Sequence, residues 1–313
     1  MLINKITVEV PRGMDRAIRH YFNKDIEEKI RLTGGITFET WLLVLSGNQK
    51  VVFRTREDYV TSGGRPIIFA DILAREKFFY DNVNKSFGRN ICPEVYVVDG
   101  AREYYDKAFQ ISQYIEGKSL RACFAEDFDD RKKIDISYKI GQIATQINSI
   151  EIDARHPYII ARRTWEDYIA NKIYERLIPL VKNNIITIDE INRITDNTRN
   201  KKAAKTLSFL HLDLWHCNMI YNNDEIFVLD AENCEFGDPL FELAVIDVGQ
   251  ELSETLIKGY KSVANIDLDS DLYYYYKLER LGLVVDVFIN QIINEPSSLY
   301  LKLFNEAKER VLI

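Results

Sequence analysis

The most informative stretch of this 313-residue chain is residues 211–218, which read His211-Leu212-Asp213-Leu214-Trp215-His216-Cys217-Asn218. Two short apolar runs follow it, and they flank the polar sequence Asn222-Asn223-Asp224-Glu225. This order is typical of a β-hairpin. Because Asp213 and Asn218 precede the hairpin and Asp230 follows it, the turn is expected to bring these three polar side chains to one end of the hairpin.

The three side chains are of a kind that can handle phosphate groups. Asn218 and Asp230 offer hard oxygen ligands, which Mg²⁺ prefers, and phosphate oxygens and water can complete its octahedral coordination. Asp213 lies on the adjoining loop, where it could orient a nucleophilic hydroxyl group. The segment closes with the sequence Gly237-Asp238-Pro239.

This pattern resembles the aminoglycoside phosphotransferase and choline kinase superfamily. The catalytic loop of that family reads His-Gly-Asp-x-x-x-x-Asn, and its metal segment reads Ile-Asp-x-x-x-x-x-x-Gly-Asp-Pro. Seven fixed positions agree in order, which makes a chance match far less probable than for one short motif. They are His211, Asp213, Asn218, Asp230, Gly237, Asp238 and Pro239.

The resemblance implies an α+β, two-lobed protein-kinase-like fold, with an antiparallel-sheet N-terminal lobe that holds one helix and a mostly helical C-terminal lobe. Apolar periodicity predicts strands at residues 36–45, 51–53, 94–98 and 108–115, and helices at 68–83, 134–150 and 164–181. We therefore predict a nucleotide-binding lobe at residues 1–116 and a C-terminal lobe at residues 117–313, which holds the catalytic loop and the acceptor site.

The resemblance also implies a nucleotide site in the first lobe. The glycine-containing hairpin of the family falls on Gly34, Gly35 and Thr37, where backbone N–H groups could approach phosphates. The basic residue that contacts phosphates would be Arg54, a departure from the lysine of many relatives, since a guanidinium fork differs in geometry from a point charge. Its carboxylate partner would be Glu76, whose helix face is otherwise apolar.

The predicted connection between the lobes reads Ile111-Ser112-Gln113-Tyr114-Ile115-Glu116-Gly117 and is similar to the family's strand that runs into Glu-Gly. The resemblance implies that the backbone of Gln113 and Tyr114 meets the purine edge of the nucleotide. Side chains there do not discriminate between ATP and GTP, so both remain candidate phosphoryl donors.

In the implied reaction the γ-phosphoryl group moves in line to a hydroxyl group, and Asn218 and Asp230 would hold Mg²⁺. An ordinary aspartate has a pKa of about 4, too low to deprotonate an alcohol in the ground state. Asp213 is therefore expected to orient the hydroxyl and to accept its proton late. His211 is predicted to brace the loop by hydrogen bonding rather than to act as the base.

Two residues in the loop depart from the family pattern. Leu212 replaces the loop glycine, and we expect its bulk to be accommodated if its backbone keeps a negative φ; otherwise the loop must differ. Trp215 occupies a position where it could stack on the acceptor or fill space under the loop.

The charge of the chain excludes some functions. It has 41 Lys and Arg against 48 Asp and Glu, a net charge of −7 and a pI near 5.4. No run of five or more Lys and Arg residues is present, so we expect no nucleic-acid partner. No apolar stretch approaches the roughly 18 residues needed to cross a bilayer, and no signal-peptide pattern is present. We expect no membrane partner and a cytoplasmic location. The four dispersed cysteines indicate reduced, structural thiols.

The acidic excess is uneven along the chain. Residues 1–116 carry 17 basic and 16 acidic side chains, so residues 117–313 carry 24 basic and 32 acidic ones. Such a field could attract a cationic acceptor to the second lobe, or it could be an ordinary solvated surface. The candidate contacts for an acceptor are Trp215, Glu235, Asp129, Asp130, Asp267, Asp269 and Asp271.

The acceptor is predicted to be a small molecule. Protein kinases insert a peptide-binding activation segment after the metal-binding aspartate, whereas here Asp230 and Asp238 are only eight residues apart. Our leading interpretation is an antibiotic-resistance kinase that modifies an aminoglycoside or another cationic natural product. A metabolic kinase for choline, methylthioribose, homoserine or a sugar is the second interpretation. A nucleotide-binding pseudokinase scaffold is the third, although the intact Asp213, Asn218 and Asp230 count against it.

Overall fold

The computed structural model describes residues 13–32, 38–60, 66–151, 164–203, 207–289 and 298–312. Contacts divide the chain into two compact units, each described here by itself. The first unit combines Met1–Asp127 with His216–Glu232, and the second combines Phe128–Trp215 with Asn233–Ile313. The hairpin that follows the catalytic-loop motif thus packs with the N-terminal part of the chain. The predicted division into lobes at residues 1–116 and 117–313 remains a prediction.

The first unit is built on a five-stranded antiparallel sheet with the strand order β1-β2-β3-β7-β6. The predicted hairpin and the two later strands are present. Their bounds are β1 (Ile26–Leu32), β2 (Glu39–Leu45), β3 (Gln49–Thr55), β6 (Val95–Asp99) and β7 (Phe109–Gln113). The shorter strands of the unit are β4 (Tyr59–Val60), β5 (Pro66–Ile67) and β8 (Lys118–Ser119).

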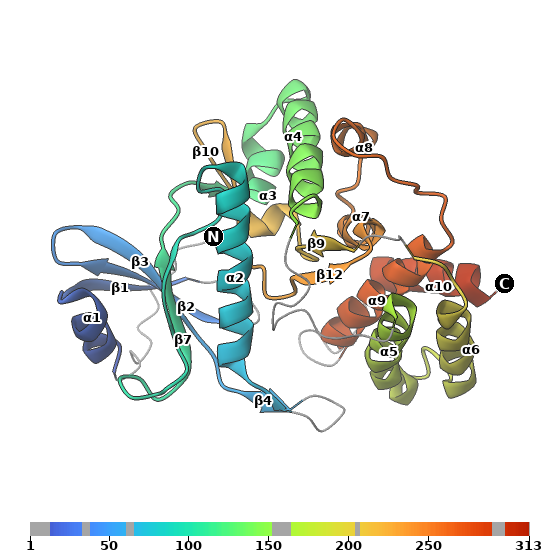
Figure 1. Cartoon of the computed structure of the whole chain (residues 1–313), viewed down its shortest axis with the longest axis horizontal. Coiled ribbons are helices and arrows are strands. Elements are labelled where there is room, and N and C mark those ends of the chain that lie inside the picture. Colours follow the sequence, from blue (N-terminus) through green and yellow to red (C-terminus); the bar gives the residue numbers. More distant parts are fainter. Residues whose placement is uncertain are drawn as a thin grey trace. The chain divides into compact units, whose positions relative to one another are not determined.

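Side-chain alternation gives the sheet two different faces. Val51 and Phe53 on β3 are fully buried in a core that also includes Met14 and Ile18 of α1 (Met14–Phe22). Arg54, between two inward positions, therefore points to the opposite face. Helix α2 (Phe69–Phe87) contacts β6 and β7 and runs beside the sheet in Figure 1.

Helix α2 confirms the predicted helix at residues 68–83 and extends it to a left-handed C-cap at Gly88. Helix α1 is an addition to the single helix expected in this part of the chain. It has nine residues, and its buried positions Met14, Ala17 and Ile18 follow a helical spacing over little more than one turn. So short an apolar pattern is a weak sequence signal.

The predicted hairpin after the catalytic loop is also present. Strands β10 (Met219–Asn222) and β11 (Glu225–Val228) pair antiparallel, with Asn222 opposite Glu225. The two residues between them, Asn223 and Asp224, both have positive φ, as a two-residue type I′ turn requires. This part of the unit also contains α3 (Leu120–Ala122), η1 (Cys123–Asp127) and η3 (His216–Asn218).

The second unit is mostly helical, as the sequence predicts. Its elements are α4 (Asp130–Asn148), α5 (Trp165–Leu177), η2 (Ile178–Asn183), α6 (Ile188–Arg199), α7 (Pro239–Val248), α8 (Glu254–Lys261), α9 (Leu272–Val287), α10 (Ser298–Leu312) and a small sheet of β9 (Ser208–Leu210) with β12 (Glu235–Gly237). None of the described helices is both long and apolar enough to span a lipid bilayer.

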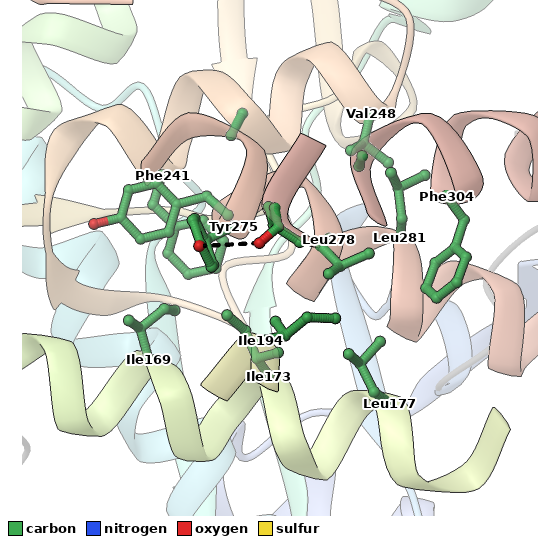
Figure 2. Packing of buried hydrophobic residues seen from close by; sticks show 14 of the residues in the cluster. Ile169, Ile173, Leu177, Ile194, Phe241, Val248, Tyr275, Leu278, Leu281 and Phe304 are labelled. Atoms are coloured by element: carbon green, nitrogen blue, oxygen red, sulfur yellow. Dashed lines mark hydrogen bonds between the residues drawn. The ribbon is translucent and has the colours of Figure 1, made fainter. Parts of the chain in front are cut away.

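The core of this unit lies among α5, α7, α9 and α10. Figure 2 shows Ile169, Ile173 and Leu177, at successive turns of α5, facing Phe241 of α7 and Leu278 of α9. Two members of the tyrosine run at the start of α9 are buried in the same cluster, as the sequence predicts for aromatic residues at this position.

Helices α4 and α8 pack closely through two glycines. A Cβ atom added to Gly141 would lie 2.0 Å from the Leu256 carbonyl oxygen, and one added to Gly259 would lie 2.1 Å from the Tyr138 carbonyl oxygen. The backbones of these two helices, neighbours in Figure 1, can therefore approach one another only without side chains at these positions.

We expect Gly141→Ala to lower the free energy of unfolding by about 1–3 kcal/mol, the range for overpacking a core, even though alanine favours helix by about 1 kcal/mol. Urea unfolding measures this loss. Gln146→Ala, at an exposed position of the same helix, is the control and should change stability by less than about 0.5 kcal/mol. A stability of Gly141→Ala equal to that of the control would contradict the close approach.

Candidate active site

Asn218 and Asp230 meet at the open end of the hairpin. Asn218 immediately precedes β10, and its carbonyl oxygen accepts a 2.8 Å hydrogen bond from the backbone N–H of Leu229, the residue before Asp230. The β10–β11 register continues this pairing, with Met219 opposite Val228. The hairpin thus brings together the two residues predicted as metal ligands.

Helix α2 holds the segment that begins at Asp230. Asp230 has a φ of 62°, a left-handed conformation that is uncommon for a residue with a side chain. Its backbone N–H donates to the Tyr80 hydroxyl at 2.7 Å, and the N–H of Ala231 donates to Glu76 Oε1 at 3.1 Å. Arg75 adds a 2.6 Å bond to the carbonyl of Glu232. Three side chains of one helix therefore determine the backbone conformation around Asp230.

Arg54 links two carboxylates of this site. Its Nη1 donates to both oxygens of Glu76, at 2.9 and 2.7 Å, and its Nη2 donates to Asp230 Oδ1 at 2.9 Å. The guanidinium also lies over the ring of Phe38, 4.0 Å from its centroid. Burial by itself lowers the pKa of Arg54, but the charges of Glu76 and Asp230 outweigh it and hold the pKa above its usual value.

Glu76 is the centre of this network. Its side chain is 1% exposed, and it accepts hydrogen bonds from Arg54, from the backbone of Ala231, from the Tyr80 hydroxyl at 2.9 Å and from Gln110 Nε2 at 3.1 Å. A buried carboxylate with this many donors has its charge well compensated. The predicted Arg54–Glu76 ion pair is present, and Tyr80 and Gln110 extend it.

The donor set around Asp230 suits Mg²⁺. Asn218 and Asp230 supply only oxygen ligands, and the Asp230 side chain is one-third exposed. Removal from water and the negative charge of Glu76 raise the pKa of Asp230, while the guanidinium of Arg54 opposes this effect. Asn218 and Asp230 are therefore suitable candidates for holding the ion.

Gln113 and Tyr114 are the two residues predicted to meet the purine. The backbone N–H of Gln113 already forms a hydrogen bond within the protein. The N–H of Gln113 donates to the Glu94 carbonyl at 2.8 Å, and the Gln113 side chain accepts from the N–H of Glu94, so this residue is tied into the sheet. Tyr114 follows β7, and the ammonium of Lys50 lies 5.7 Å from its ring centroid. Gly34, Gly35 and Thr37 lie outside the described residues.

Asp213 lies in the second unit, on a loop that His211 braces. The Asp213 N–H donates to His211 Nδ1 at 3.1 Å, so His211 has the predicted bracing role. The carbonyl of Asp213 accepts a 2.8 Å bond from the N–H of Trp215. These bonds use the backbone of Asp213, and its carboxylate is 17% exposed.

The structure decides between the two alternatives for the backbone of Leu212. Its φ is 58°, in the left-handed region, so the loop does not accommodate leucine through a negative φ. This conformation costs a residue with a side chain roughly 1–2 kcal/mol, whereas glycine adopts it freely. The Leu212 side chain is fully buried in the large core of the second unit, and such burial contributes about 1.5–3 kcal/mol. Burial thus offsets the backbone strain.

Glu242 of α7 holds the other side of the loop. Its carboxylate is 1% exposed and accepts hydrogen bonds from the N–H of His211 at 2.6 Å and of Leu212 at 3.0 Å. Burial raises the pKa of Glu242 to about 7, although the two backbone donors and the charge of Arg280 act in the opposite direction.

The Glu242 carboxyl should make the stability of the protein depend on pH. Its pKa rises from 4.5 in an unfolded chain to about 7 here, so the folded state binds more protons between these values and loses stability as the pH rises through them. We expect a loss of about 3 kcal/mol relative to Glu242→Gln between pH 4.5 and 7. Urea unfolding of both proteins at pH 5 and pH 8 measures it. Parallel pH profiles would show that Glu242 titrates normally.

The predicted acceptor contacts that are most buried have partners inside the second unit. The Trp215 indole N–H donates to the Val245 carbonyl at 2.8 Å, and its ring lies against Gly249. Glu235 accepts a hydrogen bond from the Tyr168 hydroxyl and is 8% exposed. Trp215 therefore fills space beside α7, and a role of either residue in binding an acceptor remains a prediction.

The five predicted aspartates are exposed and are not gathered at one place by any described contact. Asp129 caps α4 by accepting from the Lys132 N–H, and Asp130 is the first residue of that helix. Asp267 accepts from the N–H of Asp269, and Asp271 pairs with Lys201 at 2.8 Å. Local structure accounts for most of these carboxylates, so their role as acceptor contacts also remains a prediction.

Several residues of this arrangement were not predicted from the sequence. Tyr80 stands four residues after Glu76 and so shares its helix face, which is a signal that could have found it. Glu242 is the one charged residue in the apolar sequence Leu240-Phe241-Glu242-Leu243-Ala244, which is a signal that its carboxylate is buried. Arg280 of α9, whose Nη1 is 4.0 Å from Asp213 Oδ1, gave no signal in the sequence.

Sequence comparisons agree with this architecture. A family model described as fructosamine kinase matches residues 155–294. A curated relative named Protein LicA homolog, from Metamycoplasma hominis, is 25% identical over 228 residues, which cover 71% of this chain and 80% of the relative.

Solved structures share the fold of the whole chain. A protein from Haemophilus somnus 129PT assigned as a fructosamine-3-kinase has a TM-score of 0.71 at 18% identity and covers 96% of this chain and 97% of its own. The ADP-bound aminoglycoside phosphotransferase APH(2'')-Ib has a TM-score of 0.61 at 17% identity, covering 95% and 97%. The chain thus has the protein-kinase-like fold of these proteins, and the matches together indicate a small-molecule phosphotransferase.

Proposed function

We propose that this chain transfers the γ-phosphoryl group of ATP or GTP to a hydroxyl group of a small molecule. The hydroxyl oxygen forms a bond to the γ-phosphorus, the bond from that phosphorus to the β-phosphate oxygen breaks, and the nucleoside diphosphate leaves. Asp213 orients the hydroxyl and accepts its proton. Asn218 and Asp230 hold Mg²⁺, which when bound neutralises charge on the phosphate oxygens.

The network of Arg54, Glu76, Tyr80 and Asp230 carries this proposal. It links a cation to a candidate metal ligand and holds that ligand in an uncommon backbone conformation. Backbone strain is retained where the surrounding structure enforces it, and such places are commonly functional sites. The network therefore supports a preorganised phosphate and metal site, with Gln113, Tyr114 and the segment that contains Gly34, Gly35 and Thr37 as further nucleotide contacts.

Two classes of acceptor have specific support. The fructosamine kinase model matches residues 155–294, which lie mainly in the second unit, and this favours a metabolic acceptor that carries a sugar hydroxyl. The acidic excess of residues 117–313 favours a cationic acceptor such as an aminoglycoside. Candidate contacts for either class are Trp215, Glu235, Asp129, Asp130, Asp267, Asp269 and Asp271.

An acceptor panel tests the proposal. The protein is incubated with Mg²⁺, ATP or GTP and one of N-fructosyl-lysine, kanamycin, choline, methylthioribose or homoserine, and release of nucleoside diphosphate is followed. Stimulation by one acceptor, with a phosphorylated product, supports a kinase and selects between the two classes. Nucleotide binding without stimulation by any member would favour the scaffold interpretation instead.

A further inference from the structure

Arg280 is a buried cation with incomplete hydrogen bonding. It lies on α9, and its side chain is 3% exposed. Its Nε atom is buried and has no hydrogen-bond partner among the described residues. A guanidinium is costly to remove from water unless its charge and donors are matched. Hydrogen bonding of Nε therefore does not account for the burial of Arg280.

The carboxylates around Arg280 come from three elements. Asp213 Oδ1 on the catalytic loop is 4.0 Å from Nη1, and Glu279 Oε2 on α9 is 3.9 Å from Nε. Glu242 of α7 also interacts with the charge of Arg280, and its carboxylate holds the loop next to Asp213. Among the described contacts, Asp213 thus lies near the cation Arg280, the buried carboxyl group of Glu242 and the braced ring of His211.

Glu279 has other cationic partners besides Arg280. Its Oε1 is 3.3 Å from Arg176 Nε and 3.9 Å from Lys172 Nζ, so two cations of α5 share with Arg280 the compensation of its charge. A distance of about 4 Å without hydrogen bonds makes Arg280 a poor structural ion pair, because such a pair recovers little of its desolvation cost. The charge is nevertheless close enough to affect the ionisation of a neighbouring carboxyl.

We propose that Arg280 is a positioning residue for Asp213: its buried charge keeps the Asp213 side chain in the carboxylate form and directed into the site, ready to accept the hydroxyl proton. This inference rests on the proposed function, in which Asp213 is the proton acceptor. The chemistry belongs to Asp213, and Arg280 acts through it.

The test measures the titration of Asp213 directly and needs no acceptor. Protein labelled with ¹³C at aspartate carboxyl carbons is titrated by NMR, and the Asp213 signal is assigned by its loss in Asp213→Asn. We expect Arg280→Gln to raise the pKa of Asp213 by about one pH unit or more, the usual effect of an opposite charge at this distance. Arg280→Lys, which keeps the charge, should restore most of the difference.

Two further variants separate this role from packing. Arg280→Met places an apolar chain of similar length in the same space, so it provides a folded variant if glutamine is not tolerated, and it should also raise the pKa of Asp213. Arg176→Gln is the matched control, since it removes an arginine from Glu279 but not from Asp213, and it should leave that pKa unchanged.

A titration of Asp213 that is the same in the parent, Arg280→Gln and Arg280→Met would overturn the proposal, and so would an equal change in Arg176→Gln. Failure of the proposed function would look different: Asp213→Asn would transfer phosphate as fast as the parent, whatever the pKa of Asp213.

Discussion

Asp213→Asn lowers the rate of phosphoryl transfer by about 10³-fold, within the 10²- to 10⁴-fold range for loss of a general base. The substitution keeps the shape of the side chain and removes its charge. Both described loop bonds of this residue use its backbone, since the N–H donates to His211 and the carbonyl accepts from Trp215. The loop should therefore keep its conformation, and the nucleotide affinity should change little because Arg54, Glu76 and Asp230 are intact.

The measurement is kcat for nucleoside diphosphate release with the acceptor that the panel identifies, together with nucleotide affinity from calorimetry. Asp196→Asn is a matched control, since this aspartate of the second unit is exposed and forms an ion pair with Arg199 of its own helix. It should leave both quantities unchanged. A variant of Asp213 that turns over like the parent would remove this residue from the mechanism.

The second large effect concerns stability. Glu76→Ala removes the acceptor of the Arg54 ion pair and leaves a buried cation, the Gln110 amide and the Ala231 N–H without this partner. Breaking a buried pair from one side costs about 3–5 kcal/mol, which is a large share of the roughly 5–15 kcal/mol that stabilises a typical protein. We therefore expect a marginally stable protein with strongly reduced nucleotide binding.

Urea unfolding and nucleotide calorimetry measure the two effects of this substitution. Glu76→Gln keeps the size and one carbonyl oxygen, so it should lose less stability than the alanine variant. Asp81→Ala is the control on the same helix, because Asp81 makes an exposed pair with Lys77, and pairs of this kind contribute about 0.3–0.5 kcal/mol. A loss below about 1 kcal/mol in Glu76→Ala would contradict the central role of Glu76 in the network.

Local pattern in the sequence was enough to predict the elements of the site. The family resemblance pointed to Arg54, and the apolar period of residues 68–83 directed Glu76 inward. The polar turn between two apolar runs predicted the hairpin that joins Asn218 to the segment of Asp230. These signals act over a few residues, within one strand, one helix or one hairpin, so they can be read without knowing the rest of the fold.

Conformation at single positions was harder to predict. The sequence left open whether Leu212 keeps a negative φ or the loop differs; the residue adopts the left-handed region, and its side chain lies in the core of the second unit. The backbone penalty can be judged from the residue type alone, whereas the compensating burial depends on helices distant in sequence. The same holds for Trp215, whose indole is anchored by a carbonyl of α7.

The sequence by itself determined the residue types of the site, their spacing and the elements that carry them, because the periods of helices and strands are local properties of the backbone. Only the tertiary structure decided which side chains hold the residues of the site in place. Tyr80 accepts a hydrogen bond from the backbone of Asp230, 150 residues away, Glu242 accepts one from the backbone of His211, and Arg280 lies near Asp213. Such contacts form only when segments distant in sequence pack within one unit, and no local period reports the partner of a buried polar group. The motif therefore predicts which residues carry the chemistry of the site, whereas tertiary packing fixes the positions of these residues.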